Sequence, residues 1–448
     1  MADNSRESTN LPGTDGLLLS DWDLVSIDDV AIQVGSGVTP RGGRESYLNS
    51  GVPLVRSQNV LMNRLDLSDV AFIGEDVHEQ MSRSSLRPGD VLLNITGASI
   101  GRVAVVPSEL KVANVNQHVC KIRLNDYCDP SFVAFYLSTA MGQAQVLGNQ
   151  YGATRQGLNY GQVRQLRIPH PPIPEQRAIA HVLRTVQRAK EATEKVIAAT
   201  RQLKASLMRH LFTFGPVPVV NAERVKLKES DIGMLPEHWE VRPLESLARL
   251  VSGGTPSKER SEYWNGPIPW ASPKDMKQPR LADAEDHISS EAAQEGSRIV
   301  PPGSVFVVIR GMILARDFPI AQAKVPMAFN QDMKAILPGD DLDSDFLLYA
   351  MVHHRARILP EIGTSAHGTK RISTSAIANF ALPLPPLSEQ REIARILTCS
   401  DQSILAEESR RKALAASFRS ILHHLMTGKL RVRDLDPTDH SHDGTAGG

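Results

Sequence analysis

The stretch nearest to a catalytic signature is a glycine-containing loop, Gly363-Thr364-Ser365-Ala366-His367-Gly368-Thr369-Lys370. It resembles a phosphate-binding P-loop, but the lysine comes one residue late and the loop does not sit between an apolar strand and a helix. Gly35-Ser36-Gly37 lacks the third glycine of a dinucleotide fingerprint. The sequence contains no HExxH zinc-protease motif. These patterns favour ordinary glycine turns over nucleotide or hydrolytic chemistry.

Cysteine and histidine spacing gives no metal-binding pattern. Cys120, Cys128 and Cys399 have no CxxC spacing, and an odd number argues against a disulfide framework. His423 and His424 are adjacent on a predicted helix, so their side chains point to different faces. We therefore expect no metal site and no catalytic constellation, which favours a binding or scaffolding protein.

The strongest signal in the chain is an internal repeat. The run Ile168-Pro169-His170-Pro171-Pro172-Ile173-Pro174-Glu175-Gln176-Arg177-Ala178-Ile179-Ala180 returns, 214 residues later, as Leu382-Pro383-Leu384-Pro385-Pro386-Leu387-Ser388-Glu389-Gln390-Arg391-Glu392-Ile393-Ala394. Pro88-Gly89, Asn116-Gln117 and His210-Leu211 return at the same distance. Solenoid repeats have periods of about 20–50 residues, so this period indicates a duplicated module and suggests a target with two parts.

Composition and charge are those of an ordinary globular protein. The 448 residues are 41% hydrophobic, and 50 Lys+Arg balance 50 Asp+Glu. Zero net charge does not exclude a nucleic-acid partner, because a local basic surface is what such binding needs. Residues 141–170 contain three arginines and no acidic residue. The polar start and the lack of a long apolar run predict a cytoplasmic protein with no membrane partner.

Two long helices must position whatever the globular parts carry. Residues 175–213 contain neither Gly nor Pro, and apolar or small residues recur at alternating three- and four-residue steps, which is a heptad-like seam. The second copy runs from Glu389 to Thr427. The predicted seam comprises Ile179, Leu183, Val186, Ile197, Leu203, Leu207 and Leu211 against Ile393, Leu397, Ile404, Leu414, Phe418, Ile421 and Leu425. Because residues 399–403 are weak helix formers, a break there is an open alternative.

The predicted fold class is α+β, with two mixed α/β domains separated by two long helices packed as an antiparallel coiled coil. Short apolar runs bounded by Gly and Pro predict the strands. The predicted parts are a polar N-terminus at 1–16, a first domain at 17–170, a helix at 171–215, a connector at 216–235, a second domain at 236–384, a second helix at 385–428 and a polar tail at 429–448.

Three motifs make the chain similar to a known family, the DNA specificity subunits of type I restriction-modification systems. The first is the pair of Pro-Pro-x-x-Glu-Gln-Arg-x-Ile-Ala helix starts. The second is the run from Glu229 to Val241, which contains Gly233-Met234-Leu235-Pro236 and Trp239. The third is Gly253-Gly254-Thr255-Pro256 followed by Tyr263-Trp264-Asn265-Gly266-Pro267-Ile268-Pro269-Trp270. The resemblance covers nearly the whole length.

The resemblance implies two target-recognition domains, each reading one half of a bipartite site in double-stranded DNA. It implies that the helices set the gap between the half-sites and dock two methyltransferase subunits, with restriction subunits completing the complex. This chain is then not an enzyme and holds no cofactor; S-adenosylmethionine, ATP and Mg belong to the partners. The first module lacks the Tyr-Trp-x-Gly-x-Ile-Pro-Trp run, having Ser46-Tyr47-Leu48-Asn49-Ser50-Gly51-Val52-Pro53-Leu54 instead, so an asymmetric site follows.

Candidate DNA-binding residues are polar side chains on expected loops, since Arg and Lys read guanine and Asn and Gln read adenine. For any one of them, a solvated surface position is an equal alternative, and phosphate contact is favoured over base contact. In the first domain they are Arg41, Arg44, Arg56, Ser57, Gln58, Asn59, Thr96, Arg102, Arg155, Gln156 and Asn159. In the second domain they are Lys258, Arg260, Ser272, Lys274, Arg310, Lys370, Arg371 and Ser373.

Residues present in both modules are expected to do something common to both. The helix starts Glu175-Gln176-Arg177 and Glu389-Gln390-Arg391 are candidate partner-binding sites, with plain helix capping as the alternative. Asn116-Gln117 and Asn330-Gln331 are expected to form turns or backbone contacts rather than to read bases. Trp264 and Trp270 are expected to pack in the core or at its edge.

Two other functions stay open from the sequence alone. One is a coiled-coil adaptor that joins proteins without reading DNA; such a protein would show no salt-dependent DNA binding. The other is an enzyme with an unrecognised active site, for instance a nuclease, which would cleave DNA with a metal ion and without partners.

Overall fold

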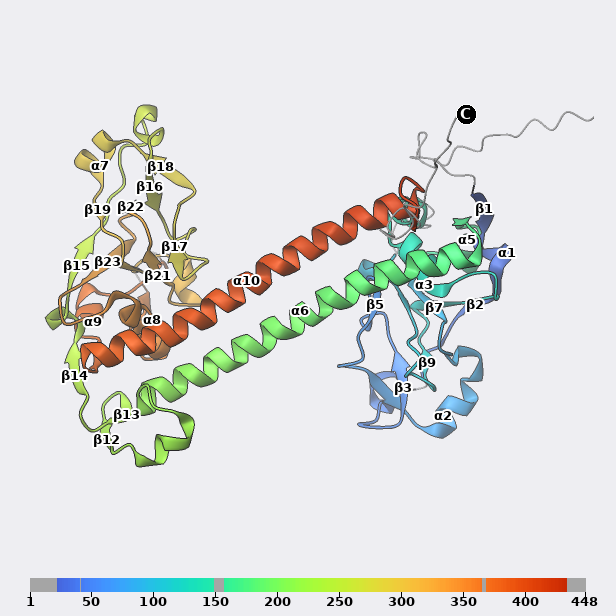
Figure 1. Ribbon diagram of the computed structural model, residues 1–448, viewed down its shortest axis with the longest axis horizontal. Helices are drawn as coiled ribbons and strands as arrows, with labels where there is room; N and C mark the ends of the chain where they lie inside the picture. Colours follow the sequence, from blue (N-terminus) through green and yellow to red (C-terminus); the bar gives the residue numbers. More distant parts are fainter. Residues whose placement is uncertain (1–21, 41, 149–156, 365–367, 433–448) are drawn as a thin grey trace, which may run out of the picture. The chain divides into compact units, whose positions relative to one another are not determined.

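The computed structural model describes residues 22–40, 42–148, 157–364 and 368–432. Within it the chain forms two compact units, and neither is a continuous piece of sequence. Unit 1 contains residues up to Thr193 together with the chain from Arg410 onward, and unit 2 runs from Glu194 to Ser409. The division therefore crosses both long helices, so each unit contains one globular domain and half of each helix (Figure 1).

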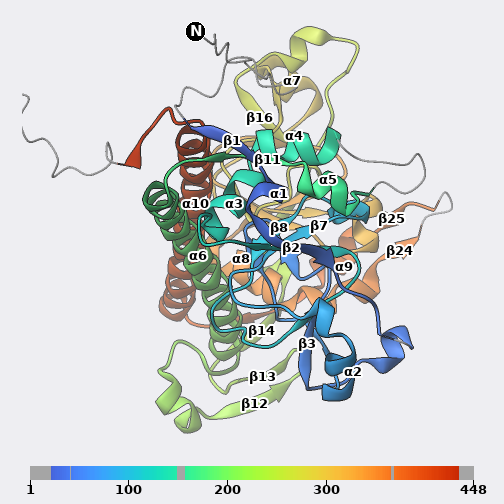
Figure 2. The same ribbon diagram turned by 90° about the vertical axis from the view of Figure 1, so that its right-hand side faces the viewer.

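The domain of unit 1, domain 1 below, is built on small mixed sheets. The central antiparallel sheet has the order β2 (Ala31–Ser36), β10 (Val119–Leu124), β7 (Val91–Asn94) and β8 (Val103–Val105). A three-stranded sheet has the order β6 (Ala71–Ile73), β3 (Val52–Val55) and β9 (Asn114–Val115). Two further sheets have two strands each: β4 (Val60–Leu61) with β5 (Arg64–Leu65), and β1 (Asp23–Ser26) with β11 (Arg167–His170). Strands β1 and β11 lie side by side in Figure 2. The helices are α1 (Ile27–Val30), α2 (Glu75–Gln80), α3 (Pro130–Leu137), α4 (Ala140–Gly148) and α5 (Tyr160–Arg164).

The domain of unit 2, domain 2 below, repeats this plan with extra edge strands. Its larger sheet has the order β15 (Ala248–Ser252), β23 (Met333–Pro338), β20 (Val305–Val308), β21 (Ile320–Ala323) and β17 (Arg280–Leu281). A four-stranded sheet has the order β18 (Asp286–Ile288), β16 (Ile268–Ala271), β22 (Met327–Phe329) and β19 (Ile299–Val300). Two further sheets have two strands each: β14 (Glu240–Pro243) with β26 (Ala381–Leu384), and β24 (Gly363–Thr364) with β25 (Lys370–Arg371). The helices are α7 (Ser290–Gly296), α8 (Ser344–His354) and α9 (Thr374–Ala378).

The central strands of both domains are apolar because both of their faces are covered. Every residue of β7 and every residue of β20 is buried, and continuous apolar runs are typical of such strands. In domain 1 the sheet packs on α3, whose N-cap Asp129 accepts a hydrogen bond of 3.0 Å from the Phe132 backbone. In domain 2, Asp343 caps α8 in the same way. The expected duplication is thus repeated at the level of strand order and helix capping.

The predicted long helices are α6 (Ile173–Phe214) and α10 (Leu387–Met426) (Figure 1). Each begins after a Pro-Pro pair and is followed by a glycine with positive φ, Gly215 at 79° and Gly428 at 69°, the usual C-terminal signal. Residues 399–403 are helical without a break. The connector at 216–235 carries more structure than expected, since β12 (Leu227–Ser230) and β13 (Gly233–Pro236) form a hairpin there.

The two helices run antiparallel within each unit, as predicted. In unit 1, Ile179 and Leu183 of α6 share a core with Leu422 and Leu425 of α10. In unit 2, Lys204 pairs with Asp401 at 2.5 Å and Arg201 pairs with Glu408. One seam prediction is wrong: Leu203 is 56% exposed, because its neighbour Lys204 takes the inward position opposite Asp401.

Candidate nucleic-acid interface

The loop that follows the central strand is held by the same backbone contacts in both domains. In domain 1, Thr96 forms a β-bridge with Gly157, and in domain 2 Arg310 forms one with Arg371. Beside each bridge the backbone N–H of Leu158 or Ile372 donates a 2.9 Å hydrogen bond to the carbonyl of Ile95 or Ile309. These pairs are related by the 214-residue period. These two loops, residues 95–102 and residues 309–316, are candidates for reading DNA, and each is called the reading loop of its domain.

Each reading loop also contacts the turn that precedes the neighbouring strand, but with different side chains. In domain 1 the Thr96 hydroxyl lies 2.7 Å from His118 Nδ1. In domain 2 Arg310 lies 3.6 Å from Asp332 in an ion pair between an exposed arginine and a half-buried aspartate. The backbone frame is therefore conserved between the domains, whereas the polar groups that it presents have changed.

Several candidates of domain 2 surround its reading loop. Arg310, Arg371 and Ser373 are exposed, and Lys370 Nζ donates a 2.8 Å hydrogen bond to the Thr364 hydroxyl. The Ser373 hydroxyl accepts from the Ala376 backbone at 3.0 Å and so caps α9. Arg371 has no side-chain hydrogen bond or ion pair within the described part of the chain. The fold thus places these four candidates on one edge of domain 2.

In domain 1 the structure covers the corresponding candidates only in part. Arg102 is exposed and pairs with no side chain among the residues described. Asn159 is exposed and caps α5, accepting a 2.9 Å hydrogen bond from the Gln162 backbone. Arg41, Arg155 and Gln156 lie outside the described residues, and Arg44 lies in a 3-10 helix at Gly43–Ser46.

Three of the four candidates at 56–59 use their side chains in hydrogen bonds within domain 1, although Gln58 stays exposed. The Asn59 side chain is only 3% exposed; its oxygen accepts from the Arg56 backbone at 3.0 Å and its amide donates to the carbonyls of Asp66 and Asp69. Arg56 donates to the Asp69 carbonyl at 2.7 Å, and Gln58 to the Asp69 carboxylate at 2.9 Å. The carbonyl of Ser57 accepts from Asn94 at 2.8 Å. A polar turn around Asp69 thus engages the side chains of Arg56, Gln58 and Asn59.

Three of the four remaining candidates of domain 2 are engaged internally. Arg260 is held by Glu262, Glu291 and Glu295 and stacks 3.8 Å from the centre of the Tyr263 ring. Lys274 pairs with Asp286 at 3.0 Å and with Glu285 at 3.4 Å. Ser272 is 6% exposed and bonds Asp275 through its hydroxyl and its backbone N–H. Lys258 alone of this group is exposed with no partner in the described ranges.

The duplicated Asn-Gln pairs form turns, as predicted. The Asn116 side chain accepts from the His118 backbone at 3.2 Å, and Asn330 accepts from that of Asp332 at 2.6 Å. Each following glutamine accepts a hydrogen bond from the threonine of a Thr-Pro pair, Thr39 for Gln117 and Thr255 for Gln331. The tryptophan prediction also holds: Trp264 and Trp270 pack edge to face, 5.0 Å between ring centres, in one small core.

The glutamines of the two helix starts are buried clamps. Gln176 and Gln390 are 0% and 1% exposed. The side-chain oxygen of each accepts a 2.8 Å hydrogen bond from the backbone N–H that begins the domain helix, Asp129 and Asp343 respectively. Their amides donate to two carbonyls each, those of Tyr127 and Pro171 in unit 1 and of Asp341 and Pro385 in unit 2. Because burial leaves neither side chain accessible, the partner-binding assignment of these two residues is replaced by a positioning role.

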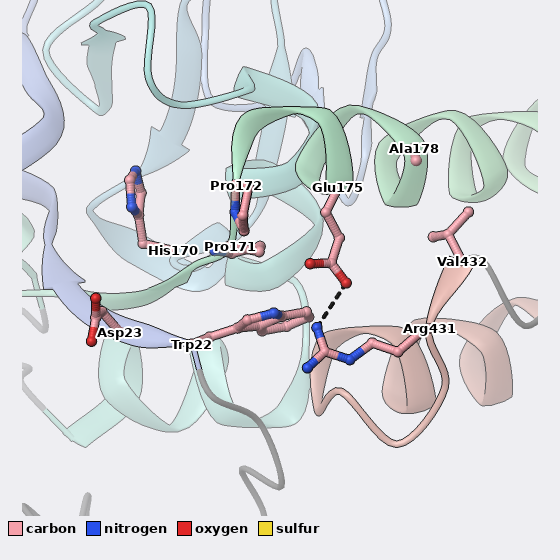
Figure 3. A pocket seen from close by; sticks show the side chains of 9 residues that line it. All are labelled: Trp22, Asp23, His170, Pro171, Pro172, Glu175, Ala178, Arg431 and Val432. Atoms are coloured by element: carbon pink, nitrogen blue, oxygen red, sulfur yellow. Dashed lines mark hydrogen bonds and ion pairs between the residues drawn. The ribbon is translucent and has the colours of Figure 1, made fainter.

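The glutamates beside them are fixed by different partners in the two units. Glu175 pairs with Arg431 at 2.8 Å, and Arg431 stacks 4.9 Å from the centre of the Trp22 ring (Figure 3). Glu389 instead accepts from His238 at 2.8 Å and from the Trp239 indole at 2.9 Å. The pocket around the first pair is lined by Trp22, Asp23, His170, Pro171, Pro172, Glu175, Ala178, Arg431 and Val432. Only the arginines, Arg177 and Arg391, stay exposed without a partner in the described chain.

Two features of the reading loops were missed from the sequence. Arg316 is exposed at the position 214 residues after Arg102, so both loops end on an exposed arginine. Met312 and Ile313 are exposed apolar residues at the tip of the second loop. Aligning the loops by the repeat period would have identified both features.

Two kinds of feature are absent from the part of the chain that the structure describes. No group of three or more His, Cys, Asp or Glu side chains there is arranged to hold a metal ion. None of the helices within the described ranges is long and apolar enough to cross a membrane.

Comparison with known proteins gives one consistent family. The model of the type I restriction modification DNA specificity domain matches twice, over residues 19–200 and 236–415. A Methanocaldococcus jannaschii protein provisionally named the MjaX type I restriction enzyme specificity subunit is 24% identical, covering 93% of this chain and 96% of its own. The EcoR124I/EcoR124II specificity subunit of Escherichia coli is 30% identical over 53% of this chain and 56% of its own.

A solved structure shares the fold. The crystal structure of a type I restriction-modification S subunit from M. genitalium superposes with a TM-score of 0.61 at 15% sequence identity, covering 91% of this chain and 97% of its own. At that identity the likeness concerns the fold alone.

Proposed function

We propose, from the premise that this chain belongs to the family of type I restriction-modification DNA specificity domains, that it is the specificity subunit of such a complex. Each domain reads one half of an asymmetric, bipartite site in double-stranded DNA. The observation that carries the proposal is the pair of reading loops, which share one backbone frame and present different side chains.

The shared and the changed positions of the loops fit different kinds of DNA contact. Arg102 and Arg316 occupy equivalent positions and are both exposed, as suits a phosphate contact that carries no sequence information. Thr96 and Arg310 are equivalent but chemically different, and so are His118 and Asp332. Groups that differ on a common frame suit base readout, where each side chain favours particular base edges. Two different half-sites follow.

The helix starts support docking of one methyltransferase subunit at each unit. The buried clamps of Gln176 and Gln390 fix each domain to its helix start. The adjacent Arg177 and Arg391 remain exposed and supply equivalent cationic contacts, so two copies are expected per chain. Glu175 and Glu389 hold the local geometry through their internal partners.

The chemistry of the complex is assigned to its other subunits. The methyltransferase subunits would supply S-adenosylmethionine-dependent adenine methylation, and the restriction subunits ATP- and Mg-dependent cleavage, in the cytoplasm. This chain would supply the choice of sequence. With 50 cationic and 50 anionic residues it should bind DNA weakly alone, because phosphate binding needs concentrated positive charge.

Methylation mapping tests this proposal. The chain is co-expressed with its methyltransferase subunits, and methylated adenines are sequenced in the host genome; one asymmetric, interrupted motif is expected. Replacing residues 17–170 by those of another family member should change one half of the motif and leave the other unchanged. A change in both halves would contradict independent reading, and a complex that methylates no defined motif would contradict the function itself.

Copy number is measured separately. Native mass spectrometry of the reconstituted complex should give two methyltransferase subunits per specificity chain. The Arg177→Ala and Arg391→Ala variants should each favour a one-to-one complex, and Lys412→Ala, an exposed helical control, should not. If the unaltered chain still bound only one methyltransferase subunit when that subunit was in excess, the proposal of two docking sites would be wrong.

A further inference from the structure

The tip of the second reading loop exposes two large apolar side chains. It forms a 3-10 turn at Met312–Ala315, in which Leu314 is only 3% exposed and anchors the turn in the domain core. Met312 is 64% exposed and Ile313 is 41% exposed. Since the anchor position of this short turn is already taken by Leu314, the other two residues have no place in the core and face outward.

Backbone hydrogen bonds hold the turn in place and so fix the direction in which these side chains point. The Gly311 N–H donates a 3.0 Å hydrogen bond to the carbonyl of Lys370, and Ile372 N–H donates to Ile309 at 2.9 Å. Gly311 has a φ of 137°, a conformation that glycine adopts without the steric penalty of a side chain. The apolar tip is therefore presented from a fixed frame.

The equivalent tip of domain 1 carries small residues on the same frame. It is a 3-10 turn at Gly97–Ser99, with Ala98 and Ser99 at the positions of Met312 and Ile313. The frame itself thus does not require bulky apolar residues. Exposed apolar side chains are common and carry no meaning singly, but here two adjacent ones stand at the tip of the second reading loop, where the first reading loop has small residues.

Positive charge surrounds the apolar tip. Arg310, Arg316 and Arg371 are exposed on the same loop and on β25, which packs against it. Two carboxylates next to this loop are engaged, Asp332 with Arg310 at 3.6 Å and Asp317 with Arg355 at 3.2 Å. An apolar centre within a cationic rim matches a DNA groove, where phosphates flank the base edges. In the major groove the apolar group that a base edge presents is the thymine methyl group.

We propose that Met312 and Ile313 contact a thymine methyl group in the half-site read by domain 2, and so help to determine its sequence. This inference rests on the proposed function and deepens it. Small Ala98 and Ser99 cannot reach such a group from the equivalent position, so the two half-sites should differ in this requirement.

The experiment removes the methyl group from the DNA and the side chains from the protein. The complex of the full chain with its methyltransferase subunits is titrated with duplexes in which each thymine of the mapped site is replaced by deoxyuridine in turn. For the unaltered chain, one replacement in the domain 2 half-site should weaken binding about four- to ten-fold, the scale of one buried methyl group with its packing. The double variant Met312→Ala, Ile313→Ser should bind the thymine and deoxyuridine duplexes equally.

Matched controls keep the outcomes distinct. Met234→Ala removes a methionine that is 46% exposed in the β12–β13 hairpin and should leave the deoxyuridine response unchanged. Thermal unfolding should be the same for all variants, since the altered side chains are exposed. Two results would overturn this inference in a complex that methylates its motif. In the first, no deoxyuridine replacement in the domain 2 half-site weakens binding by the unaltered complex. In the second, a replacement weakens binding by the unaltered complex and by the double variant equally. If the complex recognises no motif, the proposed function fails instead.

Discussion

Tyr349 donates a hydrogen bond of 2.7 Å to Oδ2 of Asp401, and this bond joins α8 of domain 2 to α10. Asp401 also pairs with Lys204 of α6 at 2.5 Å, and Arg280 donates to both Tyr349 and Thr398. Burial raises the pKa of Tyr349 to about 12, so its hydroxyl remains a donor at neutral pH. In domain 1 the equivalent position is Phe135, which packs against Phe418 with ring centres 5.9 Å apart.

Replacing Tyr349 with phenylalanine should therefore destabilise unit 2 selectively. The variant removes the hydroxyl that accepts from Arg280 and donates to Asp401, and a hydrogen bond to a charged group contributes about 1.5–3 kcal/mol. Calorimetric unfolding should show a loss of about 1–3 kcal/mol. Tyr127→Phe, at a tyrosine that is 72% exposed, serves as the control and should change stability little. Equal effects of both variants would argue against a stabilising role for the hydrogen bonds of Tyr349 with Arg280 and Asp401.

The clamp glutamines should be among the most sensitive polar positions. Gln390→Leu removes the hydrogen-bond partner of the part-buried Asp343 N–H and of two carbonyls, of which that of Pro385 takes part in a buried bond. A buried polar group left without a partner costs about 1–3 kcal/mol, and a part-buried one costs less because water can reach it. We expect a loss of about 2–4 kcal/mol in urea unfolding, with the same result for Gln176→Leu. The control is Gln202→Ala at an exposed position of α6. Clamp variants as stable as the control would show that the glutamines position nothing.

Unit 2 should lose stability as the solution becomes acidic. His354 is buried on α8 next to Phe212, and burial, followed by the charges of His353 and Arg357, lowers its pKa from 6.5 to about 3. Between these two pH values His354 is protonated in the unfolded chain but neutral in the folded chain. The free energy of unfolding is therefore highest above about pH 6.5 and decreases as the pH falls towards 3. At pH 5 the loss should be about 2 kcal/mol.

The check is thermal unfolding at pH 7.5 and pH 5.0. His354→Leu removes the titrating group and should reduce the difference between the two pH values, whereas His181→Leu, at an exposed position of α6, should not. An unchanged pH dependence in His354→Leu would assign the effect to other groups.

Shortening both helices should change the gap in the recognised site. Deleting residues 194–200 and 406–412 removes one heptad from each helix, which at 1.5 Å per residue shortens it by roughly 10 Å, or about three base pairs. Methylation mapping should then give the same half-sites with a shorter spacer, because the deletions lie outside both globular domains. An altered half-site with an unchanged spacer would contradict the role given to the helices.

The features that sequence could predict are those with a strong periodic signal. The repeat, the two long helices and their antiparallel course follow from spacing over many residues, so one misplaced position such as Leu203 does not disturb them. The error at Leu203 is local: Lys204 faces inward and pairs with Asp401, and the adjacent Leu203 points to solvent. Such pairing is set by the folded helices and leaves no mark in a hydrophobic pattern.

The individual site residues were harder to predict because one residue type serves several purposes. Asn59 and Gln58 have the side chains that read adenine, but the same amides satisfy a turn around Asp69. Arg260 has the side chain that reads guanine, but three glutamates surround it. Gln176 and Gln390 begin helices where polar residues are ordinary, so their burial could not be foreseen. The partners that the fold brings beside each side chain decide its role.

The division of both helices between the units also constrains how the protein is made. The core of unit 1 contains Leu422, Leu425 and Met426 beside Ile179 and Leu183, and Glu175 finds Arg431 as its partner. During synthesis, domain 1 and the first half of α6 leave the ribosome long before these residues exist. The apolar surface of domain 1 and of the first half of α6 therefore stays uncovered until almost the whole chain has been translated. This exposure makes the nascent chain a candidate for chaperone binding.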